Sequence, residues 1–133
     1  MKVGIVTTWF ERGAAYVSKQ FRDILKQDHE VFIYARGGES YGIGDPNWDD
    51  ETVTWGRPPA SYASSDVNYQ DFKVWLTNNN IDCVLFNEQL MWEPVLICRD
   101  LQVMTGAYID YYTERSVPMF GVYDFIVCNT RRH

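Results

Sequence analysis

The feature that most constrains the fold is the alternation of short apolar runs with amphipathic helical patterns. The apolar runs are rich in β-branched residues and too short for helices, so they predict strands. Strands are predicted at residues 2–7, 30–35, 52–55, 82–86, 106–109 and 125–128. Helices are predicted at residues 14–27, 66–79 and 94–101, with a short one at 116–121. In the first helix, the apolar residues Val17, Phe21, Ile24 and Leu25 recur at helical spacing and predict its buried face.

This order of elements indicates an α/β fold. Strands that alternate with helices form parallel sheets, and the strands are joined by right-handed crossovers. Several of the predicted strands are almost continuously apolar, as expected when helices cover both faces of the sheet. The chain has 133 residues, which fits one domain. We therefore expect residues 1–133 to form a single Rossmann-like domain, with a mainly parallel sheet and helices on both faces.

Charge and cysteine content limit the classes of binding partner and the cellular compartment that we expect. The formal net charge is −6, so the chain lacks the basic surface that a nucleic-acid binder needs. The three cysteines, Cys83, Cys98 and Cys128, are not spaced as metal ligands and are expected to be buried reduced thiols. These thiols, and an amino-terminal stretch without the pattern of a signal peptide, predict a cytoplasmic protein.

Aromatic residues are frequent, at 16% of the chain, and several fall in predicted loops. These are Trp9, Phe10, Trp48, Tyr111 and Tyr112. Such residues either stack against sugars or bases, or pack beneath the loops that carry them. Packing is the simpler expectation.

The loop after the first strand, TTWFERGAA, contains one glycine, Gly13. A dinucleotide-binding loop needs three closely spaced glycines, so that fingerprint is absent, as is the lysine-containing phosphate loop. Without those glycines, Arg36 after the second strand is weak support for a bound 2′-phosphate. A glycine beside a helix N-terminus favours an anion or a hydroxyl group, because free N–H groups point there. The alternative is that Gly13 only permits a tight turn.

Polar residues follow the later strands, at the edge where open parallel sheets bind ligands. Two of them, Glu88 and Asp110, are carboxylates directly behind strands and could accept a proton from a sugar hydroxyl. Each could equally be a helix-capping or surface acid. The others are Asn87, Tyr111, Thr130 and Arg131. His29 lies at the opposite edge, and no Ser/His/Asp, Cys/His or metal-ligand cluster can be assembled.

Stretches in order along the chain carry a resemblance to a known family. They are the opening strand KVGIVTTW, the loop ERGAAYVS, the turn and strand DHEVFIYARGG, and the segment YDFIVCNTRRH. Together they resemble the N-terminal domain of GT-B glycosyltransferases, in particular the retaining family 4 (group 1) type. The resemblance covers essentially the whole chain, although Asp28 stands where the family frequently has glycine.

The resemblance implies that this domain mainly binds the acceptor: a glycan, a lipid or a small molecule. The nucleotide-sugar donor would bind the C-terminal domain, which is missing here, so we expect a fragment that is inactive alone. The family needs no bound cation, and we expect no cofactor and no metal. Peripheral membrane association of the full-length enzyme is compatible with this resemblance.

The resemblance also assigns roles to residues. Gly13 would lie near the acceptor and the donor phosphates. Asp110, the expected catalytic residue, stands where the family often has a histidine near the reacting sugar. Substrate binding is expected from Gly13, Asn87, Glu88, Tyr111, Thr130 and Arg131.

Two other functions remain open. One is a self-sufficient α/β module that binds a small ligand or nucleotide without catalysis. The other is a nucleotide-dependent oxidoreductase, against which the missing glycine fingerprint weighs.

Overall fold

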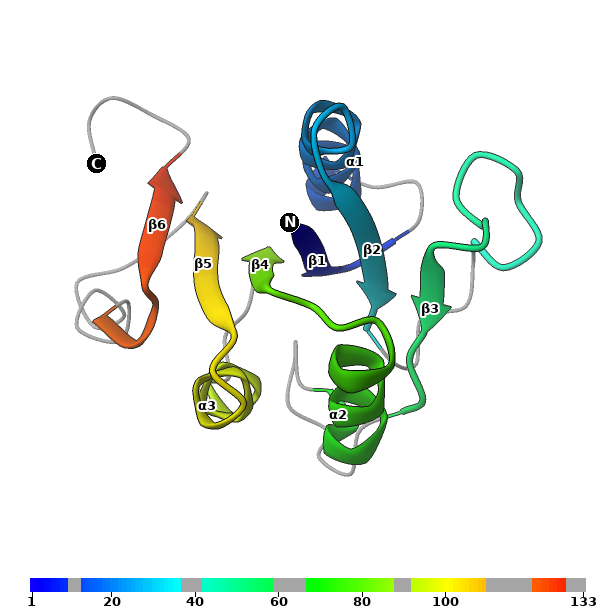
Figure 1. The fold of residues 1–133 in the computed structure, drawn as a ribbon. Coiled ribbons are helices and arrows are strands. Elements are labelled where there is room, and N and C mark those ends of the chain that lie inside the picture. Colours follow the sequence, from blue (N-terminus) through cyan, green and yellow to red (C-terminus); the bar gives the residue numbers. More distant parts are fainter. Residues whose placement is uncertain (10–12, 37–41, 59–66, 88–91, 110–120, 129–133) are drawn as a thin grey trace.

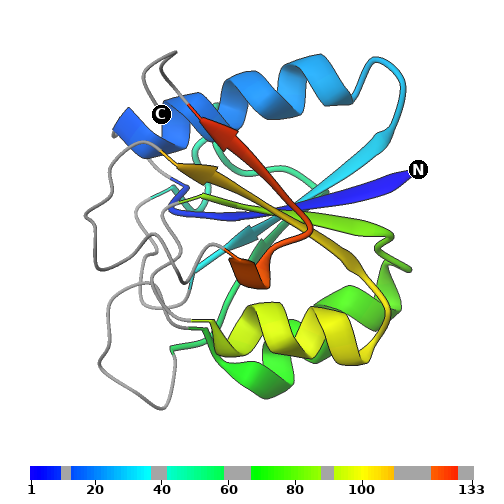
Figure 2. The ribbon, with the colours of Figure 1, turned by 90° about the vertical axis from the view of Figure 1, so that its left-hand side faces the viewer.

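A six-stranded parallel sheet lies between one helix on one face and two helices on the other (Figures 1 and 2). The structure is a computed structural model that describes residues 1–9, 13–36, 42–58, 67–87, 92–109 and 121–128. The strands are β1 (Lys2–Thr7), β2 (Glu30–Ala35), β3 (Val53–Trp55), β4 (Cys83–Asn87), β5 (Met104–Ile109) and β6 (Phe125–Cys128). The helices are α1 (Gly13–Leu25), α2 (Tyr69–Asn78) and α3 (Glu93–Asp100). The predicted Rossmann-like α/β class is confirmed.

The predicted strands match the observed ones closely, and the helices differ mainly at their ends. α2 begins at Tyr69, because the side chain of Asn68 caps the helix by accepting a hydrogen bond from the backbone N–H of Asp71. β5 begins at Met104, earlier than predicted, because Met104 N–H bonds to the carbonyl of Asp82. Most of the short helix predicted at 116–121 lies outside the described residues.

The strand order is β3-β2-β1-β4-β5-β6, and every neighbouring pair is parallel. β1 lies in the interior of the sheet, with Val3 opposite Val31 of β2 on one side and Cys83 of β4 on the other. Along the chain, β2 and β3 are therefore added on one side of β1, and β4, β5 and β6 are then added on its other side. The gap between the carboxyl ends of β1 and β4 is the topological switch point of the sheet, where such folds bind ligands.

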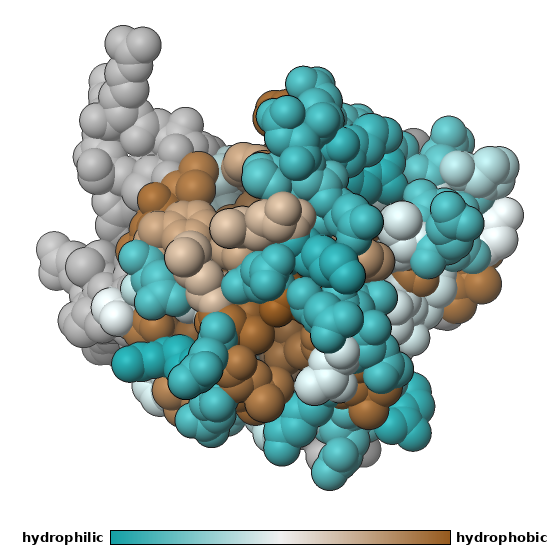
Figure 3. Space-filling view, in the orientation of Figure 1, coloured by the Kyte–Doolittle hydropathy of each residue, from teal (hydrophilic) through white to brown (hydrophobic). Residues whose placement is uncertain are grey.

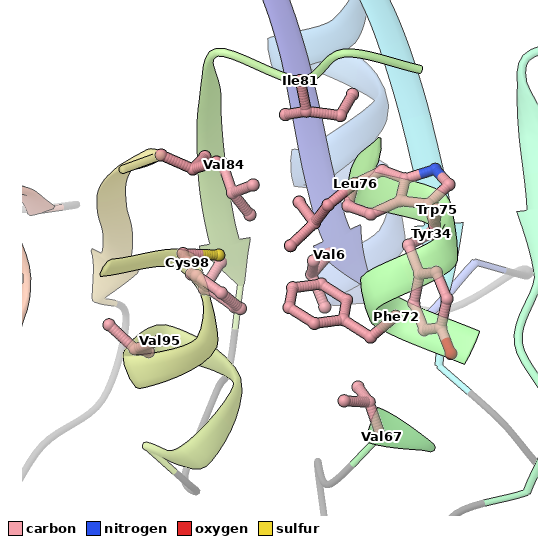
Figure 4. Packing of buried hydrophobic residues seen from close by; sticks show 12 residues of the cluster. Val6, Tyr34, Val67, Phe72, Trp75, Leu76, Ile81, Val84, Val95 and Cys98 are labelled. Atoms are coloured by element: carbon pink, nitrogen blue, oxygen red, sulfur yellow. The ribbon is translucent and has the colours of Figure 1, made fainter. Parts of the chain in front are cut away.

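Two apolar cores fill the space between the sheet and its helices. On the α1 face, Ile5, Ile33 and Leu85 pack with Ala15 of the helix. On the opposite face, Phe72 of α2 stacks on Trp75 with ring centroids 5.7 Å apart (Figure 4). The second core consists of Val6, Tyr34, Val67, Phe72, Trp75, Leu76, Ile81, Val84, Phe86, Val95, Cys98 and Val103. Successive β1 residues thus serve opposite cores, which explains why this strand is almost entirely apolar.

The buried face of α1 agrees with the predicted one in part. Phe21 and Leu25 pack against the α1-side core as predicted, whereas Ile24 is 63% exposed. The same face also carries Ala15 and Ser18, which are fully buried, and the Ser18 hydroxyl lies at the carboxyl end of β1. Apolar spacing alone favoured Ile24 because a serine does not contribute to an apolar pattern.

The aromatic residues that the structure describes in the predicted loops support the packing interpretation. Trp9 and Trp48 are both buried, and their rings meet edge to face with centroids 5.1 Å apart. The indole N–H of Trp9 donates to the carbonyl of Trp48. Lys19 of α1 lies over the Trp48 ring, 4.5 Å from its centroid. This contact joins the segment around Trp48 to α1.

Cys83 and Cys98 are free, buried thiols, as predicted. Burial raises the pKa of both, and that of Cys98 reaches about 12, so this thiol is neutral at physiological pH. The side chain of Cys128 lies outside the described part. None of the helices described in the structure is long and apolar enough to cross a membrane.

Gly4 of β1 gives the first testable prediction. A Cβ atom at this position would overlap the indole ring of Trp75, which is buried in the core. Gly4→Ala should therefore lower the free energy of unfolding by about 1–3 kcal/mol, the usual cost of overpacking a core. Urea denaturation measures this difference. Gly121→Ala is the matched control, since a Cβ atom there would meet no neighbour, and an equal loss in both variants would contradict the proposed contact.

Candidate functional site

The switch point carries a chain of buried hydrogen bonds between side chains from three elements. Asn87 Nδ2, at the end of β4, donates to Ser18 Oγ of α1 at 2.7 Å. Ser18 Oγ donates to Thr7 Oγ1 of β1, also at 2.7 Å, and Thr7 Oγ1 donates to the carbonyl of Thr8. Thr7, Ser18 and Asn87 are at most 1% exposed. Because buried polar groups need partners, these bonds hold α1 at the carboxyl ends of β1 and β4.

Arg36 adds a positive charge to this cluster. It directly follows β2, and its backbone N–H donates to the carbonyl of Thr7 at 3.0 Å. Its guanidinium Nη1 donates to the carbonyl of Asn87 at 2.8 Å, and the residue is only 4% exposed. Arg36 thereby connects the ends of β2 and β4 across β1. We call Thr7, Thr8, Ser18, Arg36 and Asn87 the switch-point cluster.

The charge of Arg36 acts on Tyr123, which precedes β6 and packs partly buried against the second core. Burial raises the pKa of Tyr123 to about 12, although the positive charge of Arg36 opposes the rise. The guanidinium group is therefore close enough to influence groups across the sheet.

The side chain of Thr8 makes no hydrogen bond to the rest of the cluster. Its hydroxyl is covered from solvent and has no hydrogen-bond partner among the described residues. A buried hydroxyl without a partner costs about 1–3 kcal/mol, so such groups are few in native proteins. A ligand group that reached this hydroxyl would remove that cost.

The structure describes two of the residues that the sequence assigned to the site. Gly13 begins α1, immediately past the loop that follows β1, and Asn87 ends β4 within the switch-point cluster. The side chain of Asn87 is used for the bond to Ser18, so it orients its neighbours. The remaining predicted residues, which are Glu88, Asp110, Tyr111, Thr130 and Arg131, lie outside the described residues.

Sequence reasoning overlooked Thr7, Thr8 and Ser18 and gave Arg36 little weight. One signal was present for Ser18, which follows Ala15 by three positions and therefore shares a helix face with it. A serine on a buried face requires a buried partner. The corresponding signal for Thr7 was its position. It is the last residue of a central parallel strand, just before the start of a helix.

Two shallow hollows lie away from the cluster, and both include His29. The first hollow is lined by Met1, Lys2, Lys26, Asp28, His29, Glu30, Asn80 and Asp82. The second is lined by Arg22, Lys26, His29, Glu30, Val31, Phe32, Asp50 and Thr52. His29 directly precedes β2, so it lies at the amino-terminal edge of the sheet, opposite the switch-point cluster, as predicted.

Within the described part of the chain, no three His, Cys, Asp or Glu residues are grouped so that they could hold a metal ion. The sequence matches no protein-family model, and no curated protein matches it either.

Removing the Ser18 hydroxyl should destabilise the fold. In Ser18→Ala, Asn87 Nδ2 and Thr7 Oγ1 both lose a buried partner, so we expect a loss of about 1–3 kcal/mol in the free energy of unfolding. Chemical denaturation followed by circular dichroism measures it. Thr77→Ala removes an exposed helix hydroxyl that bonds only to carbonyls of its own helix and serves as the control. Equal stability of the Ser18 variant and the wild type would refute the hydrogen-bonded role of this residue.

Proposed function

We propose that this chain is the acceptor-binding half of a GT-B glycosyltransferase. The complete enzyme would move a sugar from a nucleotide-sugar donor to a glycan, lipid or small-molecule acceptor. The observation that carries the proposal is the switch-point cluster, which places two threonines, a serine, an amide and a guanidinium at the carboxyl ends of β1, β2 and β4. These groups are buried and most of them are bonded to one another, so they would fix the strand ends beside which an acceptor lies rather than contact the acceptor themselves.

One feature is shared with the nucleotide-binding alternatives, and another weighs against a dinucleotide-dependent oxidoreductase. The strand order β3-β2-β1-β4-β5-β6 is that of nucleotide-type α/β domains, in which the ligand lies beside the first strand and its helix. The loop before Gly13 lacks the glycines that bring a backbone close to a dinucleotide. The Thr8 hydroxyl is covered from solvent and has no partner among the described residues, so an acceptor could bond to it only if the chain around it moved.

The proposed roles divide between orienting and contacting residues. Asn87, Ser18 and Thr7 hold α1 and the strand ends in place, which fixes where the acceptor lies. Glu88, Tyr111, Thr130 and Arg131 would contact the acceptor, together with the backbone at Gly13. Asp110 would accept the proton of the acceptor hydroxyl as its oxygen bonds to the donor sugar and the bond between that sugar and the nucleotide phosphate breaks, so that the nucleotide leaves. The free buried thiols suit a cytoplasmic enzyme.

Calorimetry with UDP-glucose and GDP-mannose tests which half of the proposed enzyme binds the nucleotide-sugar donor. One arm uses the 133-residue chain, and the other uses the chain extended through the natural reading frame. We expect donor binding only to the extended form, because the donor site would lie in the second domain. Tight binding to the 133-residue chain would indicate a complete nucleotide-binding module, and a reading frame that stops at His133 would also contradict the proposal.

Thr8→Val tests the site within the extended form. Valine has the shape of threonine but lacks the unpartnered hydroxyl, so the melting temperature should stay the same or rise. If the hydroxyl meets the acceptor, the kcat/KM for the acceptor should fall about 10-fold or more, the value of one lost hydrogen bond at a site. Thr54→Val, on the half-buried edge strand β3, is the control. Unchanged kinetics in the Thr8 variant would exclude Thr8 from the acceptor site.

A further inference from the structure

A hollow of about 440 Å³ lies where the end of α1 meets the start of β2 and the turn before β3. The pairing of β2 with β3 begins at Ile33, and the hollow lies beside the residues of β2 that precede this position. Its size is in the range of pockets that hold small molecules. The lining residues, all of them described, are Arg22, Lys26, His29, Glu30, Val31, Phe32, Asp50 and Thr52. We call this space the Arg22 hollow.

Arg22 is a largely buried cation without a close acceptor among the described residues. Its side chain is only 13% exposed. Its Nη1 lies 3.4 Å from Asp50 Oδ2 and its Nη2 lies 3.5 Å from Asp23 Oδ1, whereas charge-assisted hydrogen bonds are normally about 2.7–2.9 Å long. Its Nε is covered and has no hydrogen-bond partner in the part of the chain that the structure describes. The guanidinium group therefore has capacity left to bind an oxygen atom of a ligand in the hollow.

Separate contacts hold Arg22 and Asp50 in place. The guanidinium group of Arg22 lies over the ring of Trp9, 5.1 Å from its centroid. Asp50 Oδ1 accepts two hydrogen bonds from Thr52, one from the backbone N–H at 2.8 Å and one from the hydroxyl at 2.6 Å. Each charged group is thus anchored by a neighbour of its own, and the two opposite charges lie side by side at the hollow.

The charges of the lining are divided between its elements. Lys26 follows Arg22 by four positions and its backbone N–H donates to the carbonyl of Arg22, so the two cations lie on the same side of the helix end. The carboxylates come from Glu30, which begins β2, and from Asp50 before β3. The side chains of Lys26 and Glu30 are 58% and 67% exposed, so both are free to turn toward a ligand. Figure 3 shows that the surface over α1 is mainly hydrophilic.

This division of charge selects the class of ligand. A ligand with only a negative charge would face two carboxylates, and a ligand with only a positive charge would face two cations. A ligand that carries both charges close together would find a partner for each of them. The hollow therefore suits a small zwitterion.

We propose that the Arg22 hollow binds a free α-amino acid with an apolar side chain. The ligand carboxylate would accept hydrogen bonds from Arg22 and Lys26, and its ammonium group would donate to Asp50 and Glu30. An α-amino acid carries both charged groups on one carbon atom, so they are neighbours, as the charges of Arg22 and Asp50 are. The hollow lies at the edge of the sheet opposite the switch-point cluster, so this site is independent of the proposed acceptor site.

The apolar part of the ligand is inferred from the rest of the lining. Val31 and Phe32 contribute apolar surface to the hollow. A space of about 440 Å³ is larger than a carboxylate and an ammonium group require, so a side chain of moderate size fits as well. Leucine is therefore a suitable probe.

A nuclear magnetic resonance titration of the 133-residue chain with leucine tests the site. The leucine concentration should reach about 10 mM, because a ligand of this size binds weakly. The amide signals that shift should be those of residues 22–32 and 50–52. Two analogues serve as comparisons: 4-methylpentanoate lacks the ammonium group of leucine, and 3-methylbutylamine lacks its carboxylate. Each should bind at least about 10-fold more weakly than leucine, because one pair of charged partners is left unused.

Asp50→Asn removes one charge while it keeps the oxygen atom to which Thr52 donates. In this variant the preference for leucine over 4-methylpentanoate should fall about 5-fold or more, since the ammonium group loses a charged partner. The melting temperature should stay close to that of the wild type. Asp45→Asn is the matched control, because Asp45 likewise accepts from a backbone N–H, that of Asn47, and is not part of the lining. It should keep the wild-type preference.

A wild-type chain whose signals do not shift with leucine would overturn the proposal. Equal affinity for leucine and for either analogue would also overturn it, because the hollow would then recognise a single charge or apolar surface alone. An equal loss of preference in the Asp45 and Asp50 variants would contradict the contact between the ammonium group and Asp50, since the net charge of the chain would then explain the effect.

Discussion

The Ser18 hydroxyl is the group on which the arrangement of the carboxyl edge depends. It lies on the buried face of α1, where a polar atom without a partner would be costly, and it both donates to Thr7 and accepts from Asn87. Ser18 shares the buried side of α1 with Ala15, and Phe21 and Leu25 pack against the same core. The helix is therefore held by apolar packing together with the two hydrogen bonds of Ser18.

The same hydrogen bonds hold the ends of three strands by side chains rather than by glycine-rich backbone. β1 contributes residues to both cores, and the hydroxyl of its last residue, Thr7, takes part in the buried chain of hydrogen bonds. Arg36 extends that chain to β2 by bonding to the carbonyl of Asn87. The ends of β1, β2 and β4 are thereby held by side chains, and the position of any ligand between them is set before it binds.

Much of the fold could be predicted from the sequence because parallel strands that helices cover on both faces have almost continuously apolar sequences. The runs at 2–7, 30–35 and 125–128 agree with the observed strands to the residue. The exposure of Ile24 and the burial of Ser18 could not be predicted, since apolar spacing favoured Ile24 and did not weigh the serine. At the carboxyl edge, the structure places Asn87 where the sequence put it, at the end of a strand, but Thr7, Thr8 and Ser18 have ordinary local patterns and become distinctive only when three elements meet.

The interaction between Ser18 and Asn87 is best measured by a double-mutant cycle. Ser18→Ala, Asn87→Ala and the double variant are unfolded in urea, and the three free-energy losses are compared. If the two side chains form one buried chain, the losses should fail to add by about 0.5–3 kcal/mol, the range for residues in direct contact. Losses that add within about 0.3 kcal/mol would show that the two residues act independently, and the carboxyl edge would then have to be held together by apolar packing alone.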